Sequence, residues 1–229
     1  MAVVISLGGS LINGSGSVDR AFLNQFKELA LKSGESLGIV TGGGKTAREY
    51  ASAAREFCGN NFVADEVAVA ATRLNAHLML ALFRGVAHPK VFKDFDKAAA
   101  ALEGHKIVVM GGIQPGQSTN AVGILAAESI RADLFVNATD VDGVYSSDPK
   151  KNPKAKRIDV IKTDELLTLT LKGKFEAGGY ALFDPVAIRI VERSRICTRI
   201  IDGRKLENIE KAIRGEAVGT FLEPAEGKT

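Results

Sequence analysis

The sequence has few cysteine and aromatic residues and little net charge. Its only cysteines, Cys58 and Cys197, lie far apart, and it has no tryptophan. Such a pair makes neither a disulfide framework nor a zinc-ligand pattern, so we expect two buried thiols in a reducing cytoplasm. The three histidines are scattered along the chain and predict no metal site. With 30 basic and 27 acidic residues, the net charge of +3 argues against a nucleic-acid or anionic membrane partner and favours a small molecule.

Long hydrophobic runs are also missing. The apolar start, Ala2 to Leu7, is far shorter than the roughly 18 residues that suggest a membrane span, and no basic leader precedes it. The chain of 229 residues is long enough to bury a substantial core. Because neither a linker nor an internal repeat divides it, we predict one domain, residues 1–229.

What the sequence does have is a series of short apolar runs, most of them followed by a glycine-bearing loop and then a helical pattern. We predict strands at 2–7, 37–40, 106–110, 134–136 and 197–201 and near Thr220, and helices at 19–33, 47–57, 65–83, 121–130, 163–172, 185–194 and 206–213. Strands that alternate with helices in this way are typical of a parallel sheet. The predicted fold is a single-domain three-layer α/β/α sandwich with an open, mainly parallel sheet.

Two of the loops are suited to binding anions. Gly8, Gly9 and Ser10 follow the first strand, and 41–46, with three glycines and a lysine, follow the second. Unpaired amides and a helix N-terminus both favour negative charge there. The second loop is not a Walker A motif, because the required first glycine is replaced by Ile39.

Two further loops are suited to nucleoside recognition. The loop 111–120 is rich in amides and hydroxyls but carries no charge, which suits the edge of a neutral base. The loop 137–149 crowds acids, hydroxyls and a tyrosine around an Asp-Gly turn. An isolated turn of this kind is more often an ordinary surface turn, and only the presence of the other loops favours a ligand site.

Two charged features have more than one interpretation. Asp65 begins the helix predicted over 65–83, where a carboxylate serves either as an N-cap or as a ligand group, and we expect the N-cap. The basic segment 150–157 is either a solvated loop or a segment close to phosphates.

Taken together, the loops make the chain resemble the amino acid kinase family, and within it the uridylate kinases of the archaeal type. The resemblance runs essentially from end to end, and any one of its motifs alone is weak. It is carried by Gly8-Gly9-Ser10, by Gly42-Gly43-Gly44-Lys45 with Ala47-Arg48, by Met110-Gly111-Gly112 with Pro115-Gly116, by the run from Thr139 to Tyr145 with Asp148-Pro149, and by Asp184-Pro185.

The resemblance implies transfer of the ATP γ-phosphoryl group to UMP, with Mg²⁺ bound through the ATP phosphates. It also implies a homohexamer, with an acceptor half at about 1–130 and an ATP half at about 131–229. Arg48 and Lys45 are the catalytic candidates. ATP would be bound by Gly9, Ser10, Gly44, Arg48, Thr139, Asp140, Tyr145 and Asp148, and UMP by Gly43, Asp65, Ile113, Gln114, Pro115, Gly116, Gln117, Ser118 and Thr119.

The sequence departs from the family at Ser6, where many members carry a lysine. The charge of that lysine must come from elsewhere, with Lys45 and Arg48 as candidates. The departure leaves open a non-catalytic nucleotide- or anion-binding protein on the same fold. Among enzymes, kinases of carbamate, acetylglutamate or isopentenyl phosphate are the alternatives. An uncharged acceptor loop disfavours a dicarboxylate such as acetylglutamate, because arginine would be expected to bind its carboxylates. A terpenoid phosphate would be expected to bind in a more apolar pocket.

Overall fold

The computed structural model describes residues 1–14, 16–147, 152–171 and 183–225. Its main feature is an eight-stranded sheet with the order β3-β4-β2-β1-β5-β9-β10-β8. The strands are β1 (Ala2–Leu7), β2 (Ser36–Thr41), β3 (Ala87–Phe92), β4 (Ile107–Met110), β5 (Leu134–Thr139), β8 (Val160–Lys162), β9 (Cys197–Asp202) and β10 (Thr220–Glu223). The short strands β6 (Val144–Tyr145) and β7 (Arg157–Ile158) form a separate antiparallel pair.

Most of this sheet is parallel. Each pairing from β3 across to β9 is parallel, and β10 alone pairs antiparallel with its neighbour β9. The predicted open and mainly parallel α/β sheet is therefore confirmed.

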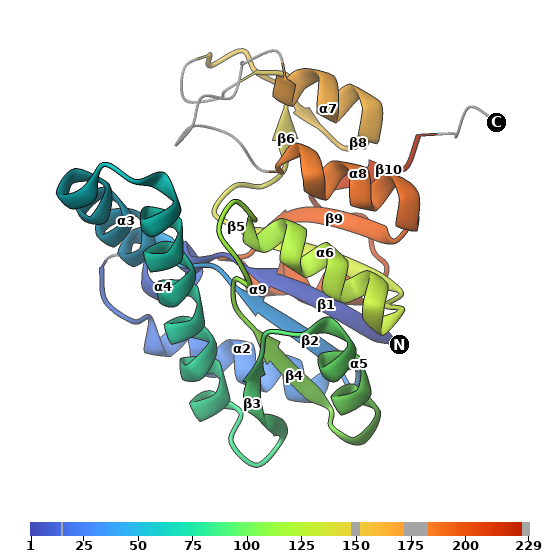
Figure 1. The fold of residues 1–229 in the computed structure, drawn as a ribbon. Coiled ribbons are helices and arrows are strands. Elements are labelled where there is room, and N and C mark those ends of the chain that lie inside the picture. The colour runs from blue at the N-terminus through green and yellow to red at the C-terminus, as the bar shows by residue number, and fades with distance from the viewer. Residues whose placement is uncertain (15, 148–151, 172–182, 226–229) are drawn as a thin grey trace.

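Helices cover both faces of the sheet (Figure 1). They are α1 (Gly9–Asn13), α2 (Arg20–Lys32), α3 (Gly44–Cys58), α4 (Asn61–Leu82), α5 (Phe95–Gly104), α6 (Thr119–Ile130), α7 (Thr163–Leu171), α8 (Pro185–Ser194) and α9 (Leu206–Ile213). One apolar cluster joins the sheet to α2, α9 and the second half of α4, and a second joins it to α5, α6, α7 and α8. None of the described helices is long and apolar enough to cross a membrane.

Strand β1 shows why the apolar runs in the sequence are continuous. Val3, Ile5 and Leu7 belong to the cluster on the α2 face, whereas Val4 belongs to the cluster on the α6 face. A central parallel strand is buried on both sides, so both alternating sets of side chains must be apolar.

The strand order places a topological switch point beside β1. Its neighbour on one side is β2, the next strand in the sequence, and on the other side is β5. Ligands of open α/β sheets bind outside the carboxyl ends of the strands at such a point. The loops after β1, β2, β4 and β5 all leave this edge.

The sequence interpretation missed strands β3, β6, β7 and β8 and helices α1 and α5, and several boundaries were wrong. Strand β3 and helix α5 occupy a region where only loops were expected, which places His88 in a strand. Helices α3, α4 and α6 begin two to four residues before their predicted starts, at Gly44, Asn61 and Thr119. The turn expected at Gly8–Ser10 continues directly into the short helix α1.

Candidate active site

The loops after β1 and β2 are packed backbone against backbone. A Cβ atom placed on Gly9 would lie 2.0 Å from the amide nitrogen of Gly44, and one on Gly42 would lie 2.6 Å from the amide nitrogen of Gly9. Gly44 also has a φ of +63°, which favours glycine. Only glycine fits at this contact, so the structure brings together Gly9, Gly43 and Gly44 as the sequence predicted.

The loop after β5 adjoins the same place. The amide of Gly8 donates to the carbonyl of Ala138 over 2.9 Å, and the amide of Gly203, after β9, donates to the carbonyl of Thr139 over 2.8 Å. The loops that follow β1, β2, β5 and β9 therefore form one continuous rim. The expected donor residue Thr139 lies on this rim.

Helix α4 fixes the loop after β4, which the sequence predicted to bind the acceptor. Thr72 Oγ1 accepts from the amide of Gly112 over 2.6 Å, and Arg73 donates to the carbonyl oxygens of Gly112 and Ile113 over 3.0 and 2.6 Å. The carboxylate of Asp65 accepts from the amide of Gly116 over 2.9 Å. Helix α4 thus holds the start and the middle of the loop.

Asp65 is not the N-cap that the sequence predicted. Helix α4 begins at Asn61, and the side chain of Asn60 caps it by accepting from the amides of Phe62 and Val63. Asp65 lies one turn inside the helix, where its carboxylate reaches the acceptor loop. The alternative interpretation, a group at the binding site, agrees with this position.

The same helix also holds the glycine loop after β2. Asn75 donates through Nδ2 to the carbonyl of Gly42 over 2.7 Å, and Thr41 donates to the carbonyl of Thr72 over 2.8 Å. These side chains are buried, so their hydrogen bonds are costly to break. Helix α4 consequently fixes the acceptor loop relative to the paired glycine loops.

In the loop after β5, the expected nucleoside-binding residues are held by local contacts. The phenol of Tyr145 donates to Asp142 over 2.9 Å, and this hydrogen bond, with burial, raises the pKa of Tyr145, which keeps the phenol protonated. Thr139 donates to the neighbouring carboxylate of Asp140. The expected ATP ligand Asp148 lies outside the described residues.

The remaining predicted residues of the acceptor loop are partly exposed, and two of them also cap helix α6. Ser118 is the N-cap of α6, accepting from the amide of Ala121 over 3.0 Å, and Thr119 is the first helical residue. The Ser118 hydroxyl also donates to Asp184, the N-cap of α8. The loop's C-terminal end is thus fixed to α8, while Gln114, Pro115 and Gln117 remain at the surface.

The two catalytic candidates lie on the first turns of α3, and both are exposed. Lys45 forms an ion pair with Glu49, with 3.5 Å between the charged atoms. Pairs this exposed contribute little to stability, so Lys45 can exchange its partner at low cost. Ser6, at the position of the family lysine, is buried and donates to Asn120 over 3.0 Å, so an uncharged pair occupies this place.

Comparisons with known proteins agree with this geometry. The profile of the amino acid kinase family matches residues 1–202. This chain belongs to the amino acid kinase family. It is 41% identical to a uridylate kinase of Methanococcoides burtonii over 222 residues, covering 96% of this chain and 94% of that protein.

Two solved structures extend the comparison of this amino acid kinase. The crystal structure of uridylate kinase from Archaeoglobus fulgidus matches with a TM-score of 0.85 and 40% identity, covering 97% of this chain and all of that one. The UMP kinase of Bacillus anthracis matches with a TM-score of 0.80 over 98% of this chain and 96% of that one, at 19% identity, which shows the shared fold.

The sequence interpretation of this amino acid kinase missed Thr72, Arg73 and Asn75. They contact loops that lie about 30 to 40 residues away in the sequence, so no local motif marks them. A weak signal was available, because Asp65, Thr72 and Asn75 fall on one helical face at spacings of seven and three. Polar residues repeated on one face of a largely apolar helix indicate that this face forms hydrogen bonds with another segment of the chain.

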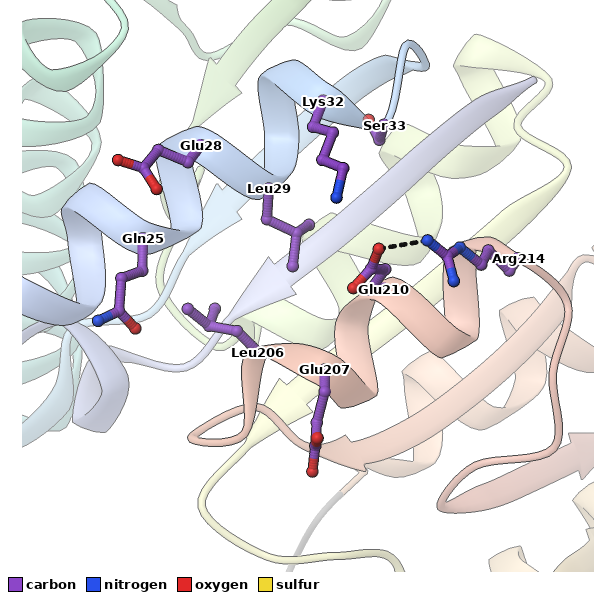
Figure 2. Close-up of a pocket in the computed structure, with 9 residues that line it drawn as sticks. All are labelled: Gln25, Glu28, Leu29, Lys32, Ser33, Leu206, Glu207, Glu210 and Arg214. Carbon is purple, nitrogen blue, oxygen red and sulfur yellow. Dashed lines mark hydrogen bonds and ion pairs between the residues drawn. The ribbon is translucent and has the colours of Figure 1, made fainter.

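A second concave region of this amino acid kinase lies elsewhere. A groove of about 400 Å³ is lined by Glu28 and Lys32 of α2, by Glu207 and Glu210 of α9, and by Arg214. Figure 2 shows Glu210 facing Arg214. Arg214 forms an ion pair with Glu210. None of the residues predicted for the site lines this groove, so we do not assign it to the reaction.

Proposed function

We propose that this amino acid kinase transfers the γ-phosphoryl group of ATP to UMP, giving UDP and ADP. The proposal is supported by two uridylate kinases that are each 41% identical to this chain, with matches that cover 94% and 100% of their lengths. The single observation that carries it is the backbone contact of Gly9 with Gly44. This contact joins Gly9, expected at the donor phosphates, to the loop after β2, in which Gly44 is expected at the donor and Gly43 at the acceptor.

In the proposed mechanism, the protein positions two phosphates and stabilises charge. The second pKa of the UMP phosphate is about 6, by analogy with phosphate monoesters, so the phosphate is largely ionised at neutral pH. Its oxygen therefore attacks without a general base. Catalysis then rests on in-line geometry and on donors aimed at the developing charge. We assign the donor phosphates to Gly9, Ser10, Gly44 and Arg48.

For the nucleosides, we assign ATP to Thr139, Asp140, Tyr145 and Asp148 and UMP to Gly43, Asp65 and the loop 113–119. The acceptor half, about 1–130, and the ATP half, about 131–229, share one continuous sheet within a single domain. The guanidinium of Arg73 hydrogen-bonds the carbonyls of Gly112 and Ile113. The arginine that contacts the acceptor loop is thus engaged with backbone, so at this loop a neutral base is favoured over the carboxylates of a dicarboxylate acceptor.

The donor set at the rim suits anions better than a bare cation. Its glycine amides and guanidinium groups complement phosphate oxygens, and no group of three or more ligating side chains gathers within the described ranges. Mg²⁺ usually keeps several waters and binds through substrate phosphates. Bound through the ATP phosphates, it would neutralise charge on the transferred group. We also propose that the enzyme is cytoplasmic.

We also propose that the chain forms a homohexamer, with the outer face of α3 and α4 as one contact. Tyr50, Phe57 and Phe62 on this face are 65%, 83% and 58% exposed. Tyr50 and Phe57 line an apolar hollow of about 460 Å³ together with Ala53, Ala54 and Val67. Exposed apolar patches of this kind mark interaction sites.

The experiment that tests the function is an acceptor panel. ADP release is measured with ATP, Mg²⁺ and either UMP, CMP, dTMP, carbamate, isopentenyl phosphate or acetylglutamate. We expect the highest kcat/KM for UMP. A much higher value for any of the last three would contradict the acceptor assignment. Tight ATP binding without turnover of any acceptor would favour a non-catalytic nucleotide-binding protein.

A further inference from the structure

Arg204 is held in a fixed position at the carboxyl end of β9. Its Nε and Nη2 donate to the two carboxylate oxygens of Asp202 over 2.8 and 2.9 Å, and its amide donates to the same carboxylate over 3.0 Å. The Asp202 side chain is 7% exposed, whereas that of Arg204 is 60% exposed. A buried carboxylate thus presents a guanidinium whose remaining N–H groups can reach a ligand.

The charge state of this pair is secure near neutral pH. Burial raises the pKa of Asp202, but the hydrogen bonds and charge of Arg204 outweigh it, so the net pKa lies below the usual value. The carboxylate is therefore ionised. This arrangement resembles a prepared anion-binding arginine more than a surface ion pair.

Arg204 lies beside the donor part of the site. Its neighbour Gly203 donates to the carbonyl of Thr139, and a Cβ on Gly203 would lie 2.5 Å from Leu11 of α1. Arg204 also lines a cavity of about 460 Å³ together with Ser10. On its other side, the carboxylates of Asp140 and Asp142 are close enough to interact with its charge.

We propose that Arg204, oriented by Asp202, binds the phosphates of the donor nucleotide that remain in ADP. The proposal rests on the proposed function, in which ATP is the donor. Arg204 shares a cavity with Ser10, assigned to the donor phosphates, and its neighbour Gly203 contacts Thr139, assigned to the ATP nucleoside, so Arg204 is near both parts of the donor. Asp202 is a positioning residue and does not touch the nucleotide.

This assignment adds a fixed positive charge at the donor phosphates, besides the exposed candidates Lys45 and Arg48, in a site where Ser6 is uncharged. A planar guanidinium matches two phosphate oxygens at once, which an ammonium group does not. The other arginine at the cavity, Arg20, is the first residue of α2 and serves as the matched control.

The test measures binding without turnover. Calorimetry gives the affinity of ADP, AMP and adenosine for the wild type and for Arg204→Ala, Arg204→Lys, Asp202→Asn and Arg20→Ala. We expect Arg204→Ala to weaken ADP binding about tenfold or more, the scale of a charge-assisted hydrogen bond, and to leave adenosine within about twofold. Arg204→Lys should retain part of the ADP affinity, Asp202→Asn should lose part of it, and Arg20→Ala should retain it in full.

Two results would overturn the inference. Unchanged ADP binding by Arg204→Ala would remove the contact, and an equal loss for adenosine and ADP would assign Arg204 a structural role at the β9 corner. Thermal melting of each variant identifies misfolding. If Arg204→Ala misfolds, Arg204→Lys, which keeps the charge and most of the volume, decides between a phosphate contact and a structural role. Failure of the proposed function is distinguishable, because the wild type would turn over no UMP while the ADP result stood.

Discussion

Gly9 is the residue on which the site geometry depends most closely. An added Cβ would lie 2.0 Å from the amide nitrogen of Gly44, and backbone cannot move aside cheaply. We expect Gly9→Ala to reduce kcat by about a hundredfold, because a shift of about 1 Å in a positioning group costs that much. Steady-state kinetics measure the change in kcat, and urea unfolding separately measures any change in the free energy of unfolding.

The matched control for this substitution is Gly104→Ala at the end of α5. No atom lies within 4 Å of its added Cβ, so this variant should keep wild-type kcat and gain about 0.4–1 kcal/mol of stability. Retention of wild-type kcat by Gly9→Ala as well would show that the two glycine loops are not coupled in catalysis.

At the scale of elements, β3 and the end of α5 meet through two histidines. The rings of His88 and His105 lie 4.7 Å apart, so these two residues are not scattered as the sequence suggested. Burial, followed by the charge of His105, lowers the pKa of His88 below its ordinary value of 6.5. The charge of Lys90 acts in the same direction. The folded protein consequently binds a proton at His88 less readily than the unfolded chain does.

This difference sets the sign of a pH effect. As pH falls from 6.5 towards the folded pKa of His88, the unfolded state takes up more protons, so the free energy of unfolding decreases. Between pH 7.5 and 5.5 the wild type should lose more stability in urea unfolding than His88→Gln does. His77→Gln, at an exposed position on α4, is the control and should behave as the wild type. Equal losses in all three proteins would exclude His88 as the cause.

The sequence predicted the strands that carry the site loops, because central strands read as continuous apolar runs. It missed β3 because this edge strand reads Ala-His-Pro-Lys-Val-Phe, with an exposed proline and lysine that break the apolar pattern. Helix starts were misplaced where caps such as Asn60 precede the apolar pattern. Local motifs marked the glycine loops and the loop 111–120, and the family resemblance marked Asp65, whereas Thr72 and Arg204 depend on contacts that only the folded chain makes.

At the scale of the whole molecule, the face of α3 and α4 is the proposed contact between copies of the chain. Light scattering after gel filtration should give a wild-type mass six times that of one chain, as the proposed homohexamer requires. Phe57→Glu should give smaller particles, because it buries a charge in the proposed contact between copies. Val186→Glu is the control, since Val186 is similarly exposed but lies on α8. A monomeric wild type, or an unchanged mass for Phe57→Glu, would contradict this contact.

The central claim is that donor and acceptor phosphates meet end to end where the glycine loops touch. The most direct measurement is the inhibition pattern of adenosine and uridine joined 5′ to 5′ through five phosphates. A single molecule that fills both halves of the site should compete with ATP and with UMP and bind more tightly than either one. Competition with ATP alone, while UMP still binds, would show that the two phosphate sites do not adjoin.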